Sequence, residues 1–563
     1  MERLRREARR AEAEFERLSR RLVPMRWASE GADCDEVVGR FCLTYDSGRP
    51  PDPDPEHGRV IDARRSAIEA LRAAFAWLPH DLNTAAPLVR YLVEDQRPEE
   101  AASAARMYHV VSGDSIWGPL LAAFAAHAST QDTAAERLLL DVLPRLGARD
   151  QERIQSLDWV LEGEDRSSYS RLAVPHAADF RRRFWVLADP LFMTPGNESW
   201  VEHVCRHIWS RILARAPVVA DMVRWAEDLE QLTVRYGVPV SRTRTPGTMT
   251  REGTLVEHYD PDQLVFTPPE LLTRGLPPTP LPGRPWELDR LRARSGFAPL
   301  TVRRVIALDH QVSRFPAADG TILRVDGRMV LDSVARGAAS IQTGLWILDS
   351  DLRSLDVRRS TAAVHSDTAD FGFEASLPGR GAFLYSLQAL HSASRLAGRA
   401  RYATDPDSAD STIRLSDPLI SFPWGLAELP TNRAHPSLRP RSHLVLAPAD
   451  TIGLYAEAIG LTPGSPYEVR LTMERASRAS LPARLVSWIG SRLGLADRAA
   501  PTRSEWVAAA SADGNATIAL ELRPAATPEG DQVIRLEILD LATGHIAETR
   551  RIVRFGEPVR PGR

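Results

Sequence analysis

The sequence changes its hydrophobic period near residue 300, and this change limits the folds that the chain can adopt. Before it, apolar residues recur every three or four positions, the spacing of amphipathic helices. After it, apolar and polar residues alternate, as in "VIRLEILDL", and turn signals such as "ADGN" separate the runs. The sequence therefore predicts a multidomain α+β protein with helical domains in front and antiparallel β-sandwiches behind.

Two features of the front half predict how its helices pack. Residues 1–24 form one predicted helix that docks on the chain's own helical region; a two-chain coiled coil is the alternative. Similar segments, an aromatic-led helix followed by an Ala-rich one, begin at Tyr91 and Phe124, 33 residues apart, and this period aligns Ala101 with Ala134. This resembles tetratricopeptide repeats, although the turn glycine is absent from both copies. Such arrays either bind polypeptides or only stack. The apolar stripe of the first helix comprises Leu4, Ala8, Ala11, Phe15, Leu18 and Leu22.

Proline-rich and polar stretches such as "RPPDPDPEHG" and "LPPTPLPGRPW" divide the chain of 563 residues. A further break is predicted at the polar stretch 401–412. The predicted domains are an N-terminal helix with a cysteine-containing segment (1–58), a tetratricopeptide-like domain (59–168), a small α+β domain (169–275), a Pro-rich linker (276–299) and two β-sandwiches (300–404 and 405–563).

Composition excludes several function classes. All 71 basic residues are Arg, so the chain has no lysine for a P-loop, a kinase site or a pyridoxal-phosphate Schiff base. The net charge of −3 gives no general attraction to nucleic acid. The sequence has no apolar run long enough for a transmembrane helix, and its start has no signal-peptide apolar region.

Cys34 and Cys42 bracket the segment "CDEVVGRFC". A loop of this length can be closed by a disulfide in an oxidising compartment. Two buried free thiols are the equally weighted alternative.

Two groups of residues stand out between 184 and 239: Phe184-Trp185, Asp189-Pro190 and 194–198 in the first, and Trp225, Asp228 and 236–239 in the second. Together they resemble the GWxTD family, whose members are envelope-associated bacterial proteins of unknown function. Arg224 and Glu227 stand where the family has Gly and Thr, and Leu229-Glu230 replaces its following Arg-Gly. The resemblance implies a periplasmic or envelope location. The lack of a signal peptide in the chain as given favours the opposite, a location inside the cell. The matching residues are Phe184, Trp185, Asp189, Pro190, Thr194, Pro195, Asn197, Glu198, Trp225, Asp228, Tyr236, Gly237 and Pro239.

Each conspicuous residue of this set has a structural role available to it. Asp189 and Asn197 are suited to capping backbone amides, and the Trp side chains offer large apolar surfaces. Asp228 is expected to cap a turn before a strand at 232–236, and Gly237 to permit a positive φ. We therefore favour a packing skeleton over a catalytic site and assign no catalytic residue.

His203 and His207 have the spacing of a two-histidine metal site, with His258 as the third ligand to consider. A helical projection places both opposite the apolar stripe that contains Cys205, which favours a polar face, solvated or touching another domain. Carboxylates at 189, 198, 227 and 228 offer the alternative of a glycosidase-type pair.

The leading functional hypothesis is a non-enzymatic interaction scaffold of the cell envelope. We expect protein partners, with glycans as a further option for the sandwiches, and no cofactor or nucleic acid. The alternative is a hydrolase that uses the carboxylates or histidines of the GWxTD-like domain.

Overall fold

A computed structural model describes most of the chain. The described residues form two compact units, drawn from 1–275 with 287–305 and from 276–286 with 306–563. Cys34, Pro239, His258 and the predicted linker 276–299 lie outside them. The described residues are 2–22, 25–27, 36–39, 41–43, 55–161, 163–217, 225–237, 241–244, 254–257, 301–404 without 333, 336 and 338, 412–424, 429–476, 502–523 and 530–556.

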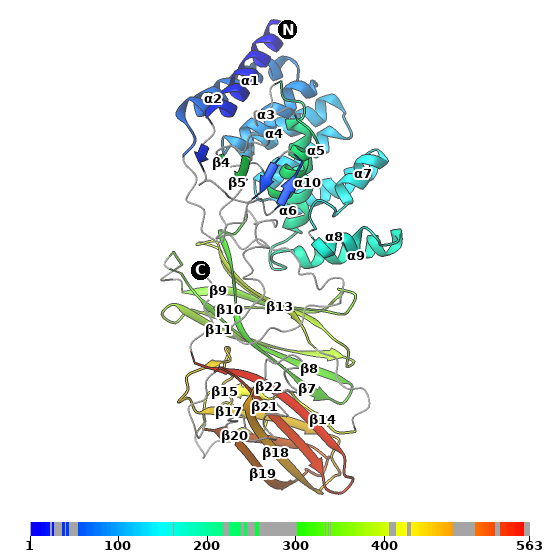
Figure 1. Ribbon diagram of the computed structural model, residues 1–563, viewed down its shortest axis with the longest axis vertical. Coiled ribbons are helices and arrows are strands. Elements are labelled where there is room, and N and C mark those ends of the chain that lie inside the picture. The colour runs from blue at the N-terminus through cyan, green and yellow to red at the C-terminus, as the bar shows by residue number, and fades with distance from the viewer. Residues whose placement is uncertain are drawn as a thin grey trace. The chain divides into compact units, whose positions relative to one another are not determined.

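The first unit is mainly helical (Figure 1). None of its described helices is long and apolar enough to cross a membrane. The helices are α1 (Glu2–Leu22), α2 (Gly58–Trp77), α3 (Leu82–Glu94), α4 (Pro98–Ser112), α5 (Trp117–Ala128), α6 (Asp132–Val142), the 3-10 helix η1 (Leu143–Arg145), α7 (Ala148–Gln155), α8 (Gly163–Tyr169), α9 (Val174–Ala188), α10 (Glu198–Leu213) and α11 (Glu227–Tyr236).

Helix α1 docks on α2 and α3, which confirms the predicted packing on the chain's own helical region. Ala8 and Phe15 of its apolar stripe are buried, and the other members of the stripe pack against the same core. The ring of Phe15 meets Tyr91 edge-to-face at 4.7 Å. Helix α1 therefore covers one end of the array formed by helices α2 to α6.

The pairs α3–α4 and α5–α6 repeat, but with a register one residue longer than the sequence predicts. The fully buried alanines at the equivalent place are Ala101 and Ala135, 34 residues apart, and not Ala101 and Ala134. Gln96 and Thr130, also 34 residues apart, both have a φ of 58°. In each turn, a pair of backbone hydrogen bonds ends the preceding helix at a residue in the αL conformation. Glycine normally occupies this position.

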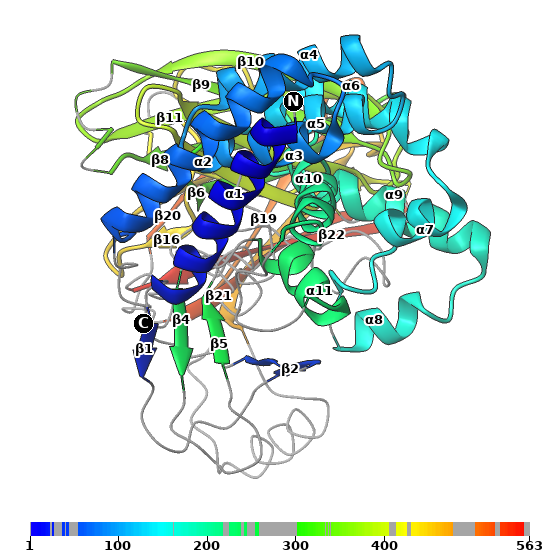
Figure 2. The same ribbon diagram turned by 90° about the horizontal axis from the view of Figure 1, so that it is seen from above.

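Helix α10 lies along the array and packs on α3, α5 and α6 (Figure 2). Its side chains Val201, Val204, Cys205, Ile208 and Ile212 belong to the same core as α1 to α6. One hydrophobic core therefore runs through the regions that the sequence divides at 58 and 168.

The predicted strand at 232–236 is wrong, because these residues belong to helix α11. The first turn of this helix carries Glu227, Asp228 and Glu230, which favour a helix N-terminus. Gly237, at φ 81°, follows the last helical residue and ends the helix. Short strands complete the unit: β1 (Met25–Trp27), β4 (Ser241–Arg244) and β5 (Thr254–Glu257) form one sheet, and β2 (Glu36–Val38) pairs with β3 (Phe41–Leu43).

The second unit consists of mostly antiparallel sheets, which confirms the predicted fold class at that level (Figure 1). In the first half, the sheet β10-β9-β12-β13-β6 accompanies the sheet β11-β8-β7; in the second half, the strands β14, β15 and β20 pair with β17 and accompany the sheet β16-β22-β21-β18-β19. The bounds are β6 (Arg304–Ala307), β7 (Asp309–Ala317), β8 (Gly320–Val330), β9 (Ser340–Leu348), β10 (Ser354–Ala363), β11 (Thr368–Pro378), β12 (Leu384–His391), β13 (Leu396–Ala403), β14 (Arg414–Leu415), β15 (Leu419–Ser421), β16 (Val445–Leu446), β17 (Ile452–Ile459), β18 (Pro466–Arg475), β19 (Thr502–Ala509), β20 (Ala516–Leu522), β21 (Gly530–Asp540) and β22 (Ile546–Phe555).

Alternating burial shows why these segments are strands. In β21, Ile534, Leu536 and Ile538 are fully buried, and the residues between them are partly exposed. Their partners across β18 include Leu471 and Val469, so apolar side chains pair across the sheet. Each half has its own core, one from 308 to 402 and one from 413 to 555, and the predicted break at 401–412 falls between them.

The two halves meet through both apolar and polar side chains on β7, where Phe315 is buried in a cluster with Leu419 and Tyr455 of the second half. The amide nitrogen of Gln311 donates to the carbonyls of Ile420 (2.9 Å) and Arg441 (2.7 Å), and its oxygen accepts from Ile420 N–H (2.8 Å). Arg314 forms an ion pair with Asp417 (3.0 Å). Hydrogen bonds of this kind let a polar strand face be buried between two sandwiches.

Candidate functional site

The first part of the GWxTD-like residue set forms the corner between α9 and α10. Asn197 is the N-cap of α10: its oxygen accepts from Trp200 N–H (3.0 Å), and its nitrogen donates to the carbonyl of Trp185 (2.7 Å). Asp189 accepts from Leu191 N–H (3.0 Å), just after α9 ends. The corner is thus held by side chains that satisfy free backbone groups.

Gly196 lets this corner lie against the start of α6. Its φ is 97°, and a Cβ there would lie 3.1 Å from the backbone nitrogen of Thr133. Thr133 donates from its hydroxyl to the carbonyl of Pro195 (3.0 Å). Pro195 and Gly196, inside the first part of the residue set, therefore attach the start of α10 to α6 of the repeat array.

Aromatic rings and two histidines pack between α9, α10 and the end of α7. Trp185 lies 4.9 Å from both Phe184 and His203, and Trp159 stacks on His207 at 5.9 Å between ring centres. Both histidines are almost fully buried, so of the two predicted alternatives, a solvated face or one touching another domain, the solvated face is wrong. They contact the preceding helical region instead, where His203 Nε2 donates to the carbonyl of Ile154 (2.9 Å). The reason is that α10 is covered on two sides, by the array and by α9 with the chain around Trp159.

Burial determines the protonation of this pair. It lowers the pKa of His203 to about 4 and the pKa of His207 well below its usual range. Among the described residues, no group of three His, Cys, Asp or Glu side chains is placed to hold a metal ion. His258, the third ligand considered, lies outside that part of the chain.

A chain of buried ion pairs crosses the other side of α10. His127, at the end of α5, contacts Asp132 at the start of α6 with one ring nitrogen and Glu202 with the other. Glu202 accepts from Arg206 Nε (2.6 Å), and Arg206 donates to the carbonyl of Arg235 in α11 (2.9 Å). Four side chains therefore connect α5, α6, α10 and α11.

The charges of this chain balance. Burial by itself would lower the pKa of His127, but its hydrogen bonds with Asp132 and Glu202 outweigh burial and raise this pKa to about 9. Burial would raise the pKa of Glu202, but Arg206 and His127 outweigh it and lower this pKa to about 2. His127 is therefore an imidazolium at neutral pH, and both ring nitrogens donate.

Asp189 and Glu198 are brought together, whereas Glu227 and Asp228 lie elsewhere. Burial, and then the negative charge of Asp189, raise the pKa of Glu198 well above its usual range. Thr194 donates its hydroxyl to Glu198. The two carboxyl groups belong to residues only 2% and 9% exposed, so the pair is closed off within the corner.

The second part of the residue set lies around α11. Asp228 accepts from Leu229 N–H (2.8 Å), and a Cβ at Gly39, in the turn between β2 and β3, would collide with its side chain. Glu227 lies 3.7 Å from Arg153 of α7. Trp225 is half-buried at the start of this segment, and the side chain of Tyr236 is outside the described set.

Sequence reasoning missed His127, Asp132, Glu202 and Arg206. One signal was available: Glu198, Glu202 and Arg206 follow one another at intervals of four along α10, which places them on one helix face. His127 and Asp132 flank the turn between α5 and α6, and their partners are far away in the sequence.

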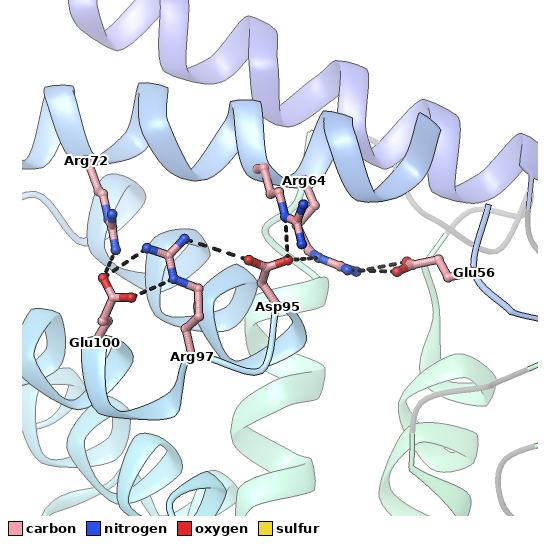
Figure 3. Close-up of polar contacts among 7 residues, drawn as sticks. Glu56, Arg64, Arg72, Asp95, Arg97 and Glu100 are labelled. Carbon is pink, nitrogen blue, oxygen red and sulfur yellow. Dashed lines mark hydrogen bonds and ion pairs between the residues drawn. The ribbon is translucent and has the colours of Figure 1, made fainter. Parts of the chain in front are cut away.

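The outer side of α2 and the turn before α4 carry a network of ion pairs (Figure 3). Arg64 contacts Glu56 (2.7 Å) and Asp95 (3.5 Å). Arg97 contacts Glu100 (2.6 Å), which also pairs with Arg72. Arginines and acids neutralise each other here, and they fasten α2 to the turn between α3 and α4.

Helix α4 presents apolar side chains to solvent near its C-terminal end. Met107 is 53% exposed, Val110 79% and Val111 47%. On the same helix, Ala101, Ala105 and Tyr108 are buried in the array. We refer to Met107, Val110 and Val111 as the α4 patch.

Comparisons with known proteins identify no family for this chain, because no family model and no curated protein matches it. Among solved structures, red sea bream transglutaminase is 12% identical with a TM-score of 0.13; the match covers 45% of this chain and 32% of that one. A β-glucuronidase of Bacteroides uniformis is 10% identical with a TM-score of 0.15, covering 42% of this chain and 26% of that one. The chain thus matches about a third of those chains or less, and at these scores nothing is concluded from the likeness.

Proposed function

We propose that this chain is a non-enzymatic interaction protein of the cell envelope, of the GWxTD type, whose helical unit binds a protein partner. Its helix pairs repeat every 34 residues, the period of tetratricopeptide repeats. Repeat arrays of this kind commonly present a surface to polypeptides. Tetratricopeptide character, GWxTD membership and envelope location all belong to this proposal.

The observation that carries the proposal is the division of surfaces on the array. Helix α10 covers α3, α5 and α6, so the chain itself fills that side of the array. The α4 patch remains exposed, while the acids and arginines beside α2 are paired with one another. Apolar side chains in such a setting favour docking of an apolar partner surface at α4.

The hydrolase alternative has less support. A raised-pKa carboxyl beside a second carboxyl is suited to acid catalysis. Glu198 and Asp189, however, are buried and hydrogen-bonded within the corner between α9 and α10. Hydrolysis of ester or glycoside substrates by the full chain, abolished in Glu198→Gln, would revive it.

Site-specific cross-linking tests the proposal. A photoreactive residue at Val110 is expected to give one reproducible adduct in the native host. The same residue at Glu99, exposed near the other end of α4, is the matched control. No adduct from position 110, or the same adducts from both positions, would contradict a partner site at the α4 patch. Fractionation of the tagged chain with the cytoplasm would overturn the envelope assignment.

A further inference from the structure

A cleft of about 480 Å³ opens between the two halves of the second unit. Strands β8 and β11 supply one wall, with the side chains of Asp326 and Asp370. Residues 422 and 438–442 supply the other wall. Its lining there comprises Phe422, Leu438, Arg439, Pro440 and Ser442. The volume is in the range of small-molecule sites, and the cleft mixes apolar and polar side chains as such sites do.

The two carboxylates of the cleft are already neutralised. Arg324 contacts Asp326 (3.0 Å), and Arg328 contacts Asp370 with two nitrogens (2.8 and 3.0 Å). Each carboxylate keeps further lone pairs for hydroxyl donors. Ser442 already donates to Asp370 (2.8 Å), which shows that a hydroxyl fits there.

Gly372 leaves room for the carboxylate of Asp326. This glycine is opposite Asp326 in the β8–β11 pair. A Cβ at position 372 would lie 2.5 Å from Asp326 Oδ1. The carboxylate therefore occupies the space that a side chain on β11 would fill.

Arg439 carries a charge that no described acid compensates. Its guanidinium lies over the ring of Phe422 at 6.0 Å, and it forms no ion pair with any described residue. The neighbouring Arg441 also lies over Phe422 (4.6 Å), but it is paired with Asp450 (3.0 Å). Among the described residues, the cleft therefore presents one cation without an ion pair, together with apolar side chains and two hydrogen-bond acceptors.

We propose that this cleft binds an acidic saccharide unit. Its carboxylate pairs with Arg439, and its hydroxyls donate to Asp326 and Asp370. An acidic peptide or a bare phosphate satisfies Arg439 but offers few hydroxyl donors to the carboxylates, so an acidic sugar fits better. The site is in the sandwiches and does not depend on a partner at the α4 patch.

Calorimetric titration of the full chain tests the proposal. The acidic probes are trigalacturonate and a hyaluronan tetrasaccharide; the others are maltotriose, a tetraglutamate peptide and inorganic phosphate. We expect binding of at least one acidic oligosaccharide, at least tenfold tighter than maltotriose, tetraglutamate or phosphate. Arg439→Gln should weaken it at least tenfold. Arg380→Gln is the matched control, because Arg380 is exposed and unpaired among the described residues and follows β11 at its other end.

Three results would overturn the proposal. One is no heat with either acidic oligosaccharide from protein of unchanged circular dichroism. Another is equal binding of tetraglutamate or phosphate, which would indicate a general anion site. The third is an equal effect of the two Arg variants. Because Arg439→Gln leaves the helical unit unaltered, cross-linking from Val110 should persist, so this proposal and the partner proposal fail independently.

Discussion

Arg90 of α3 contacts Glu16 of α1 at 2.7 Å, and both side chains are buried. Tyr91 donates its hydroxyl to the same carboxylate (2.7 Å). Arg90 also contacts Glu94 (2.6 Å), so one guanidinium neutralises two acids. A third acid, Glu12, lies one helical turn before Glu16 in α1; it is buried and forms no ion pair with a described residue.

Glu12 makes the docking of α1 sensitive to pH. Burial, and then the charge of Glu16, raise the pKa of Glu12 from 4.5 to about 7. A carboxyl with a raised folded-state pKa stabilises fully below pH 4.5 and loses that contribution as pH rises through 7. The difference corresponds to about 3 kcal/mol above pH 7. Glu12→Gln, which stays neutral, should protect α1 amides from hydrogen exchange at pH 8 and change little at pH 5.

Glu14→Gln is the control for this experiment. Glu14 is exposed on the same helix and is paired with Arg17. Equal protection by both variants at pH 8, or no difference between wild type and Glu12→Gln, would contradict the role of Glu12.

The αL conformation of Thr130, in the turn between α5 and α6, leads us to predict a stabilising substitution. Thr130 has a φ of 58°, where a β-branched side chain is strained and glycine is not. Thr130→Gly should raise the free energy of unfolding by about 1 kcal/mol in urea titrations followed by circular dichroism. Ser129→Gly is the control, because Ser129 has a φ of −88° and gains nothing from glycine there. Destabilisation by Thr130→Gly would show that the turn is unstrained.

The sequence predicted the elements whose period is long and regular. The stripe of α1 and the alternation in β18 and β21 repeat often enough to identify helix and strand. The ten residues of α11 do not: Leu232, Val234 and Tyr236 alternate as in a strand, although Leu229, Leu232 and Thr233 also satisfy helical spacing. The acidic first turn and Gly237 decide in favour of a helix, and both are local signals that outweigh three alternating residues.

Long-range packing explains the remaining differences. The projection of α10 placed His203 away from its apolar stripe correctly, but a single helix does not reveal that Trp159 and Trp185 cover its second side. The repeat register shifted by one because no glycine marks the αL residue of either turn. The cleft at Arg439 joins residues more than a hundred positions apart, which no local pattern reports.

The hydrogen bonds of Gln311 let us predict how strongly the two halves of the second unit are attached to each other. Removing its side chain in Gln311→Ala leaves the Arg441 carbonyl and the Ile420 N–H without their partner, which costs about 3 kcal/mol, whereas the Ile420 carbonyl still accepts from Arg441 N–H. Hydrogen exchange of the Ile420 amide should accelerate about a hundredfold in the full chain. Gln342→Ala, an exposed position in β9, should leave this amide unchanged. Unchanged exchange in Gln311→Ala would show that water replaces the amide without cost.

His127 and His203 give the helical unit opposite responses to pH. His127 has a folded-state pKa raised to about 9, so its contribution is complete below pH 6.5 and is lost as pH rises through 9. His203 has a folded-state pKa lowered to about 4, so its contribution is complete above pH 6.5 and is lost as pH falls through 4. These two histidines taken alone make the unit most stable near pH 6.5. In thermal unfolding of the full chain followed by tryptophan fluorescence, His127→Gln should destabilise at pH 6 by about 3 kcal/mol, because Asp132 loses its cation and Glu202 keeps only Arg206. His203→Gln should instead flatten the acid side of the profile by up to about 3 kcal/mol. Parallel pH profiles for the two variants would contradict the assignment of a charged His127 and a neutral His203.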